Sequence, residues 1–286
     1  MLAVTVVWGF NHVVAKLAAS GISLVMQAGI RFACTFVLVL VWARLSGRKL
    51  AAPPGAIGVG LFTGVLFAGE FFCIFAGLAH TTASRMAVFI YVAPCVTALG
   101  LHYLVPSERL SARQWAGVLI AFAGVFAAFS EGFGAETQIS TLSGDALAIG
   151  GGVLWGATTI LIRATPLAGA SAETTMACQV LVAALLLPLA SLAIGEPGVV
   201  QVTPVVVASM LWQILAVSFV SYLVWFWLLT RYRASHLAAF TFVAPLVGVA
   251  AGVLVLGEPL TGAFLGGALL VALGVTLVNW RAKSGS

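Results

Sequence analysis

The sequence has very little charge. Asp, Glu, Lys and Arg together make up 7% of its 286 residues, whereas hydrophobic residues make up 62%. A soluble domain carries about 25% charged and about 45–50% apolar residues. Because so few charges cannot cover a surface in water, the composition excludes a soluble globular protein. It predicts a polytopic membrane protein whose partner is the lipid bilayer.

The sequence also lacks the motifs of metal sites, disulfide frameworks and common enzymes. Its four cysteines lie in apolar runs and no two form a CxxC pair, so neither a disulfide framework nor a zinc site is indicated. It contains no HExxH, P-loop, GxGxxG or GxSxG motif. We therefore expect no enzyme activity, no catalytic residue, no cofactor, no metal, and no ATP-driven pumping by this chain alone.

Long apolar runs are what the sequence does contain. A membrane-spanning helix needs about 20 mostly apolar residues. That window predicts an all-α protein with ten transmembrane helices, over residues 1–19, 24–43, 55–77, 82–104, 111–130, 144–163, 172–194, 204–230, 234–256 and 260–280.

Basic residues are unevenly distributed between the two sides of these spans. If the N-terminus is cytoplasmic, Arg85 is the one basic residue in the segments outside. The inside segments and flanks hold ten, namely Arg44, Arg48, Lys49, Arg109, Arg113, Arg163, Arg231, Arg233, Arg281 and Lys283. This bias predicts a plasma (bacterial inner) membrane protein with both termini in the cytoplasm. It also accounts for the net charge of +5 without a nucleic-acid partner.

The chain is internally repeated. The string ASRMAVFIYVAP (83–94) returns as ASHLAAFTFVAP (234–245), a shift of 234 − 83 = 151. Likewise VVWGFNHVVAKLA (6–18) aligns with VLWGATTILIRAT (153–165), a shift of 147. The similar shifts predict two copies of one five-helix unit, in domains 1–131 and 143–282. Because five is odd, the second copy is inverted in the membrane, as in many secondary transporters.

These motifs resemble a known family. Two W-G pairs, two A-S…F…A-P strings, each followed by an acidic residue and a glycine-spaced helix, are similar to paired EamA modules. Such modules define exporters of the drug/metabolite transporter superfamily. The aromatic-rich first, third and eighth spans most resemble its aromatic amino-acid exporter branch. The resemblance implies a central substrate cavity between the repeats, with the fifth and tenth helices at the periphery.

The repeated strings each end in a proline. Pro94 and Pro245 remove a backbone donor, so the carbonyls of Ile90 and Thr241 lose their helical partners and each helix bends or opens. Two interpretations remain open. The prolines are static kinks, or they form a symmetric pair of gating bends around the cavity.

Polar residues beside tryptophan mark the first and sixth spans. Trp8, Asn11 and His12 share one helical face, and their repeat counterparts are Trp155, Thr158 and Thr159. Such residues are not expected to face lipid. They form hydrogen bonds between helices, or they line the substrate cavity, with His12 as a group that could titrate.

Glu70 is the one carboxylate deep within a predicted span. Arg31 is predicted at the same depth, about 10 Å below the outer interface, so an ion pair is geometrically open. Lys16 is a second possible partner. Either Glu70 belongs to a structural pair, or it binds a substrate ammonium group or a proton. Its repeat counterpart is Ser221 (70 + 151), so this site would be asymmetric.

Aromatic residues crowd the spans that the resemblance places around the cavity. For any single ring, packing against lipid or the protein core is the better explanation. Taken together, however, the rings suit a ligand with a flat apolar part, and we assign Phe75, Tyr91, Tyr222 and Trp225 to substrate binding through stacking and cation–π contacts. Glu108, by contrast, precedes a helix and is interpreted as structural, as is its counterpart Glu258.

Together these features predict a secondary transporter that exports small metabolites, in particular aromatic or other neutral amino acids, by alternating access through a central cavity. The alternatives are a multidrug or nucleotide-sugar carrier of the same superfamily, and a non-transporting membrane scaffold. A monomer or weak homodimer is expected. Proton coupling and facilitated export both remain open.

Overall fold

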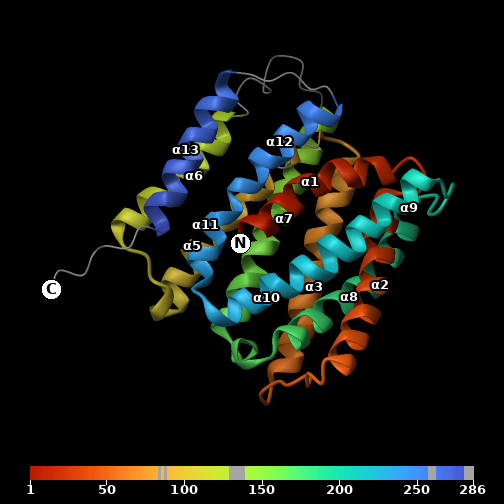
Figure 1. The fold of residues 1–286 in the computed structure, drawn as a ribbon, viewed down its shortest axis with the longest axis horizontal. Helices are drawn as coiled ribbons and strands as arrows, with labels where there is room; N and C mark the ends of the chain where they lie inside the picture. The colour runs from red at the N-terminus through yellow and green to blue at the C-terminus, as the bar shows by residue number, and fades with distance from the viewer. Residues whose placement is uncertain (83–84, 87–88, 129–138, 257–261, 280–286) are drawn as a thin grey trace.

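The computed structural model describes residues 1–82, 85–86, 89–128, 139–256 and 262–279. They are almost entirely helical, which confirms the predicted fold class (Figure 1). The elements, in chain order, are α1 (Leu2–Ala18), α2 (Leu24–Leu45), α3 (Ala56–Leu78), η1 (Ile90–Val92), α5 (Ala93–Leu104), η2 (Pro106–Glu108), α6 (Ala112–Ala128), α7 (Ile139–Ala164), η4 (Pro166–Gly169), α8 (Ala172–Ala193), α9 (Pro204–Leu211), η5 (Trp212–Ser221), α10 (Tyr222–Arg231), α11 (Ala234–Thr241), α12 (Val243–Leu256) and α13 (Gly262–Asn279).

Each predicted span coincides with a helix or with a broken helix. Within the described residues, five helices are long and apolar enough to cross a membrane: Leu24–Leu45, Ala56–Leu78, Leu142–Ala164, Ala172–Ala193 and Pro204–Arg231. Shorter apolar helices account for the other five spans. The sixth helix begins at Ile139, earlier than the predicted residue 144.

The packing of the helices follows the repeat. Helix α1 packs on α12, and its counterpart α7 packs on α5. In the same way α3, the third span, packs on α7 and α8. Its counterpart is the eighth span, in which α9 and η5 pack on α1 and η5 packs on α2. Two further pairs, α2 with α8 and α6 with α13, each join a helix to its own counterpart, and α5 of the fourth span packs on α11 of the ninth. The α6–α13 pair lies at one side of the bundle, at the periphery as the family resemblance implied (Figure 1).

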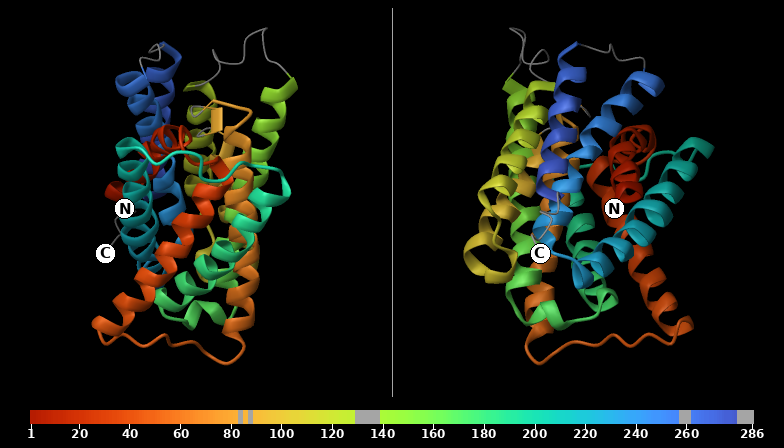
Figure 2. Two further views of the ribbon diagram at one scale, coloured as in Figure 1. Left: turned by 90° about the vertical axis from the view of Figure 1, so that its right-hand side faces the viewer. Right: turned by 60° about the vertical axis from the view of Figure 1, so that its left-hand side comes forward.

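The connections show that the second repeat is inverted. The α2–α3 and α7–α8 connections lie at the same end of the bundle, where the Ser171 amide donates to the Ala51 carbonyl at 2.9 Å (Figure 2). At the other end, Ile22 and Val199 form an antiparallel bridge between the α1–α2 and α8–α9 connections. At each end, the connection between the second and third helices of one repeat thus pairs with the connection between the first and second helices of the other repeat, as inversion requires.

The glycine of each W-G pair allows two helices to approach closely. A Cβ added at Gly9 would lie 2.3 Å from the Ala244 carbonyl oxygen, and one at Gly156 would lie 2.6 Å from the Val96 side chain and 3.2 Å from the Ala93 carbonyl oxygen. Both distances below 3 Å require something to move. Ala93 and Ala244 are repeat counterparts (93 + 151), so the same contact occurs in both halves and explains why each repeat keeps a glycine.

The fourth and ninth spans are each interrupted three residues before a proline. Tyr91 in η1 has non-helical angles (φ −78°, ψ 16°), and Pro94 lies in the first turn of the helix that follows. Phe242, the counterpart of Tyr91 (91 + 151), separates α11 from α12. The helix opens ahead of the proline ring, so Pro94 lies in the first turn of a new helix, where its missing donor costs least. Pro245 lies within the first turn of α12.

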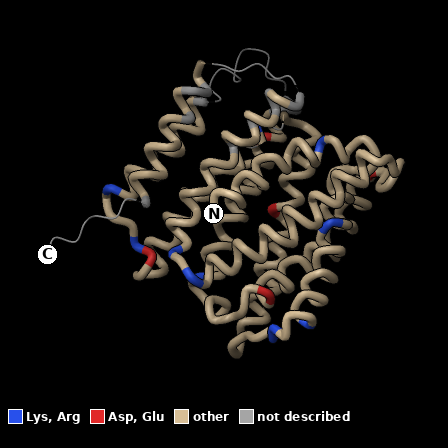
Figure 3. The backbone as a smooth tube through the Cα atoms, viewed as in Figure 1, with Lys and Arg blue, Asp and Glu red and all other residues tan. Residues whose placement is uncertain are grey.

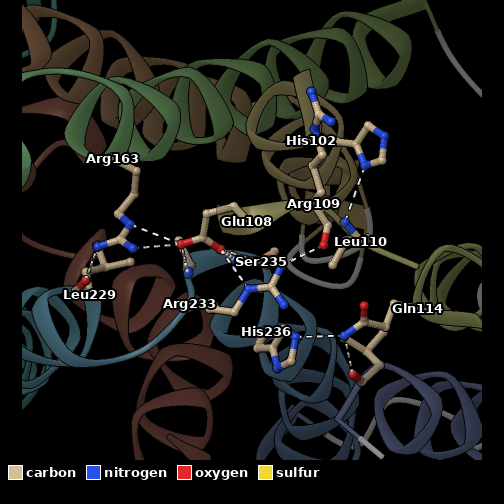
Figure 4. A network of polar contacts seen from close by, with 12 residues as sticks. His102, Glu108, Arg109, Leu110, Gln114, Arg163, Leu229, Arg233, Ser235 and His236 are labelled. Carbon is tan, nitrogen blue, oxygen red and sulfur yellow. Dashed lines mark hydrogen bonds and ion pairs between the residues drawn. The ribbon is translucent and has the colours of Figure 1, made fainter. Parts of the chain in front are cut away.

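Charged residues gather at the helix ends, with few between them (Figure 3). Glu108, which has no exposed surface, is the centre of one such group (Figure 4). Its carboxylate accepts hydrogen bonds from Arg163 at 2.8 and 3.1 Å, from the Ala234 amide at 3.0 Å, and from the amide and hydroxyl of Ser235 at 3.3 and 2.9 Å. Arg233 lies 3.8 Å away.

This carboxylate was expected to serve the helix that follows it, α6. Instead it caps the N-terminus of α11, in the other repeat, and so joins the two halves. Burial acts to raise the pKa of Glu108, but the hydrogen bonds from Ala234, Ser235 and Arg163 outweigh burial and hold that pKa below its ordinary value. The counterpart Glu258 lies outside the described residues.

Candidate functional site

A cavity of about 750 Å³, its open mouth included, lies between the two repeats. Its walls come from α1, α3, η1, α7, α8, η5 and α10, which belong to both repeats. The lining residues are Trp8, Asn11, His12, Phe67, Glu70, Phe71, Ile74, Phe75, Ile90, Tyr91, Trp155, Thr158, Thr159, Ile162, Gln179, Val217, Tyr222, Trp225 and Phe226.

The structure brings all eleven predicted substrate-binding residues into this one cavity: Trp8, Asn11, His12, Glu70, Phe75, Tyr91, Trp155, Thr158, Thr159, Tyr222 and Trp225. Pro94 is buried but is not part of the lining. The structure establishes where the eleven predicted residues lie; their role in substrate binding remains a prediction.

Nine of the nineteen lining residues are Phe, Tyr or Trp, and the Trp8 ring contacts three of the others. Its ring meets Trp155, Tyr222 and Trp225 edge-on, with centroids 5.6, 6.0 and 5.4 Å apart. Tyr91 meets Trp155 in the same way at 5.7 Å. Edge-to-face contacts fix the rings relative to one another. Because Trp8 and Trp155 are repeat counterparts, the two halves of the protein touch at this point.

The Trp8 ring is also held by a hydrogen bond. Its Nε1 donates to the Ser221 hydroxyl at 2.7 Å, and that hydroxyl donates in turn to the Val217 carbonyl. Ser221 is the last residue of η5, a ten-residue π-helical stretch (Trp212–Ser221) inside the eighth span. Wider π-helical turns inside α-helices are frequent at functional sites.

Several buried polar atoms in the cavity wall have no hydrogen-bond partner among the described residues. They are Asn11 Oδ1, Glu70 Oε2, Thr158 Oγ1 and both amide atoms of Gln179. The Thr159 hydroxyl, in contrast, donates to the Trp155 carbonyl at 3.2 Å. Unsatisfied polar groups are costly in a membrane interior and are tolerated where they face a cavity. They leave donors and acceptors free for a ligand.

The ion pair between Glu70 and Arg31, which their similar depth left open, is not formed. All three Arg31 guanidinium nitrogens are buried without a hydrogen-bond partner in the described structure, and the cation lies 4.5 to 5.2 Å from the ring centroids of Phe32, Phe71 and Phe75. Lys16 donates to the Thr81 carbonyl at 3.3 Å. The Glu70 carboxylate therefore faces the cavity without a direct cationic partner from Arg31.

The apolar walls follow the repeat, but the charge does not. Phe71, Ile74 and Phe75 of α3 correspond, at a shift of 151, to Tyr222, Trp225 and Phe226 of α10, and all six line the cavity. At the same shift Glu70 corresponds to Ser221. The cavity thus has two similar aromatic walls, and a carboxylate on the α3 side only.

Sequence reasoning missed Gln179 as a lining residue. The signal was present, because Gln179 is a long polar side chain within the apolar run of α8 and has no exposed surface. Phe67, Ile74, Ile90, Ile162 and Val217 carried no such signal, since an aliphatic or phenyl side chain in a membrane helix faces lipid or protein equally well.

The comparisons with known proteins agree with this architecture. The model of the EamA-like transporter family matches residues 1–130 and 142–280, that is, two copies. The chain belongs to the EamA-like transporter family. It is therefore a multi-pass membrane protein of the transporter class, and the resemblance to paired EamA modules is confirmed.

Curated relatives of this family member span nearly its whole length. An "uncharacterized transporter" of Bacillus subtilis is 26% identical over 284 residues, covering 98% of this chain and 90% of that protein. Two proteins named "probable amino-acid metabolite efflux pump" are each 26% identical. The Salmonella typhimurium one covers 96% of this chain and 91% of its own length, and the Escherichia coli one 98% and 95%. One crystal structure superposes with a TM-score of 0.79 at 18% identity, covering 97% of this chain and 95% of the other, which shows a shared fold.

Proposed function

We propose that this family member is a secondary transporter that exports small metabolites, with aromatic or other neutral amino acids as substrates. The observation that carries the proposal is the cavity at the contact of the two repeats, where an aromatic wall combines with unpartnered polar atoms. Small-ligand sites are lined mainly by apolar and aromatic side chains with a few polar groups, and the lining of this cavity has that composition. Two relatives whose names refer to amino-acid metabolite efflux support the substrate class.

The inverted repeat supports a mechanism of alternating access. The units 1–131 and 143–282 would rock against each other around the Trp8–Trp155 contact, while the breaks at Tyr91 and Phe242 absorb the bending. In this proposal Pro94 and Pro245 keep those breaks open by removing backbone donors. Both termini lie in the cytoplasm of a plasma membrane protein, as the basic residues favour.

A second, smaller cavity indicates a route out of the central one. Its volume is about 250 Å³, its open mouth included, and it shares Ile162 and Phe226 with the central cavity. Beyond them lies Arg163, which is fixed by Glu108 and by the Leu229 carbonyl at 2.9 Å. We assign the pair Ile162 and Phe226 as the inner gate and the Glu108–Arg163 contact as the latch that keeps it shut.

The alternative substrate classes are less well matched. A nucleotide sugar or phosphorylated metabolite needs Lys or Arg near its phosphates, and no Lys or Arg is among the described residues that line the central cavity. A multidrug carrier shares the aromatic wall, so transport assays have to distinguish it.

The test is counterflow in proteoliposomes. Purified protein is reconstituted with unlabelled tryptophan, phenylalanine or alanine inside, and entry of the labelled compound is followed against protein-free liposomes. The proposal predicts accumulation for tryptophan and phenylalanine. Absence of counterflow for every amino acid, with active counterflow of an aromatic drug cation, would replace it by the multidrug alternative.

A further inference from the structure

We infer that Glu70 makes the central cavity selective for ligands that carry an ammonium group without a free carboxylate. Aromatic amines and amino-acid amides would then bind more tightly than the parent amino acids. The inference rests on the proposed function, since it assumes that this cavity is the substrate site. Among the small metabolites proposed there, it ranks amines and amides above the parent amino acids.

Charged side chains are scarce in the wall of the central cavity. Glu70 is the one carboxylate among the described lining residues, and none of them is Lys or Arg. Besides His12, the polar side chains there are hydroxyls, indoles and amides, which carry no charge. A cationic ligand therefore finds a counter-charge in the cavity wall, whereas an anionic ligand does not.

The Glu70 carboxylate has an unsatisfied hydrogen-bond acceptor. Its side chain is buried, and its Oε2 atom has no hydrogen-bond partner within the described structure. A carboxylate accepts several hydrogen bonds, and an ammonium group brings three donors together with the opposite charge. An ammonium group on a ligand would satisfy an atom that the protein itself leaves unsatisfied.

Arg31 does not supply the matching site for a carboxylate. Its guanidinium group has no exposed surface and lies 4.9 and 5.2 Å from the rings of Phe71 and Phe75, two residues that form the cavity wall. Arg31 is not itself part of that wall. Its N–H groups are buried and are not presented to a ligand.

An amino acid would place its own carboxylate close to Glu70. The ammonium and carboxylate groups share one carbon atom, so binding the first at Glu70 brings a like charge to the same carboxylate, which weakens binding in a low-dielectric site. Esters, amides and amines lack that second charge.

The asymmetry of the cavity sets the orientation of the ligand. The repeat counterpart of Glu70 is Ser221, whose hydroxyl is engaged by Trp8. The ammonium group would therefore point to the α3 side, and the flat part of the ligand would lie against Trp8, Tyr222 and Trp225, where aromatic and cation–π contacts are available.

The experiment compares four ligands that share one indole ring: tryptamine, tryptophan amide, tryptophan and indolepropionate. Binding to the purified full-length chain is measured by titration calorimetry at neutral pH, and counterflow of each is measured in proteoliposomes. We expect tryptamine and the amide to bind at least about tenfold more tightly than tryptophan, with indolepropionate weakest. In Glu70→Gln the two cationic ligands should lose about tenfold or more, while tryptophan changes little.

Two further variants make the result specific. Glu70→Asp keeps the charge and should keep the ranking. Glu173→Gln removes another buried carboxylate, which pairs with Arg48 at 3.1 Å outside the cavity, and should leave the ranking unchanged. If Glu70→Gln does not fold, the wild-type ranking still decides the question.

The outcomes separate the two proposals. Tryptophan binding as tightly as tryptamine, or an unchanged amine preference in Glu70→Gln, overturns the selectivity while transport by this cavity stands. Failure of all four compounds to bind or to be exchanged overturns the proposed function itself.

Discussion

Replacing Glu108 by glutamine should destabilise the fold more than any other conservative change of a carboxylate in the described structure. The change keeps the shape of the side chain but removes the charge that faces Arg163 at 2.8 Å and leaves one fewer acceptor for the start of α11. Glu108 has no exposed surface and the Arg163 side chain is 20% exposed, so solvent screens this pair only weakly. Breaking a buried pair of this kind costs about 3–5 kcal/mol.

The assay is thermal unfolding of the purified protein in detergent. A loss of about 3 kcal/mol corresponds to a Tm lower by roughly 6–12 °C, at about 2–4 °C per kcal/mol. Glu173→Gln is the matched control. Its partner Arg48 has a side chain that is 54% exposed, so that loss should stay near 1 kcal/mol or below. Equal Tm values for the two variants would refute the structural role of Glu108.

The same residue predicts a pH dependence. The pKa of Glu108 is lower in the folded protein than its ordinary value, because the hydrogen bonds and charge around it favour the ionised form over the cost of burial. Its contribution to stability is therefore complete above the unfolded-state pKa of about 4.3 and is lost as the pH falls through the lower folded-state value. In Glu108→Gln this part of the acid destabilisation should be absent. An identical acid response in both proteins would contradict it.

Three further predictions concern packing, gating and coupling. Gly9→Ala should lower the Tm, since its Cβ would lie 2.3 Å from the Ala244 carbonyl oxygen. In the control Gly58→Ala, the added Cβ meets nothing within 4 Å, so this change should leave the Tm unchanged or raise it. Equal Tm changes in the two variants would contradict the close contact at Gly9. Pro94→Ala and Pro245→Ala should bias the protein toward opposite facings, read as opposite changes in cysteine labelling at Thr158→Cys from the two sides of the membrane. Unchanged labelling and normal transport would make these prolines ordinary kinks. If export is proton-coupled, an imposed pH gradient should accelerate it; equal rates with and without the gradient indicate facilitated export.

The helices and the cavity residues were predictable because each depends on a local property of the sequence. Span length follows from the thickness of the bilayer. Asn11, Thr158 and Glu70 could be assigned because a polar side chain in an apolar helix avoids lipid. The repeat added independent support, since Trp8 and Trp155 recur at one shift and meet in the structure.

The contacts between helices were not predictable in the same way. Position along a helix gives the depth of Arg31 and Glu70 in the membrane, but the rotation of each helix about its axis is set by packing. Arg31 therefore turns to three phenyl rings instead of pairing with Glu70. Glu108 caps a helix of the other repeat, 126 residues away along the chain, because the inverted fold brings the two ends together.

The most direct test of the account is to fill the central cavity and measure export. Thr158 lines that cavity with its hydroxyl unpartnered among the described residues, and a tryptophan in its place would occupy the space proposed for substrate. Leu119→Trp adds a similar ring to α6, where Leu119 is 59% exposed on the outer surface of the bundle. In proteoliposomes that exchange labelled tryptophan, Thr158→Trp should reduce counterflow to the level of protein-free liposomes, while Leu119→Trp should match the wild type. Normal counterflow in a correctly folded Thr158→Trp protein would show that substrate does not pass through this cavity.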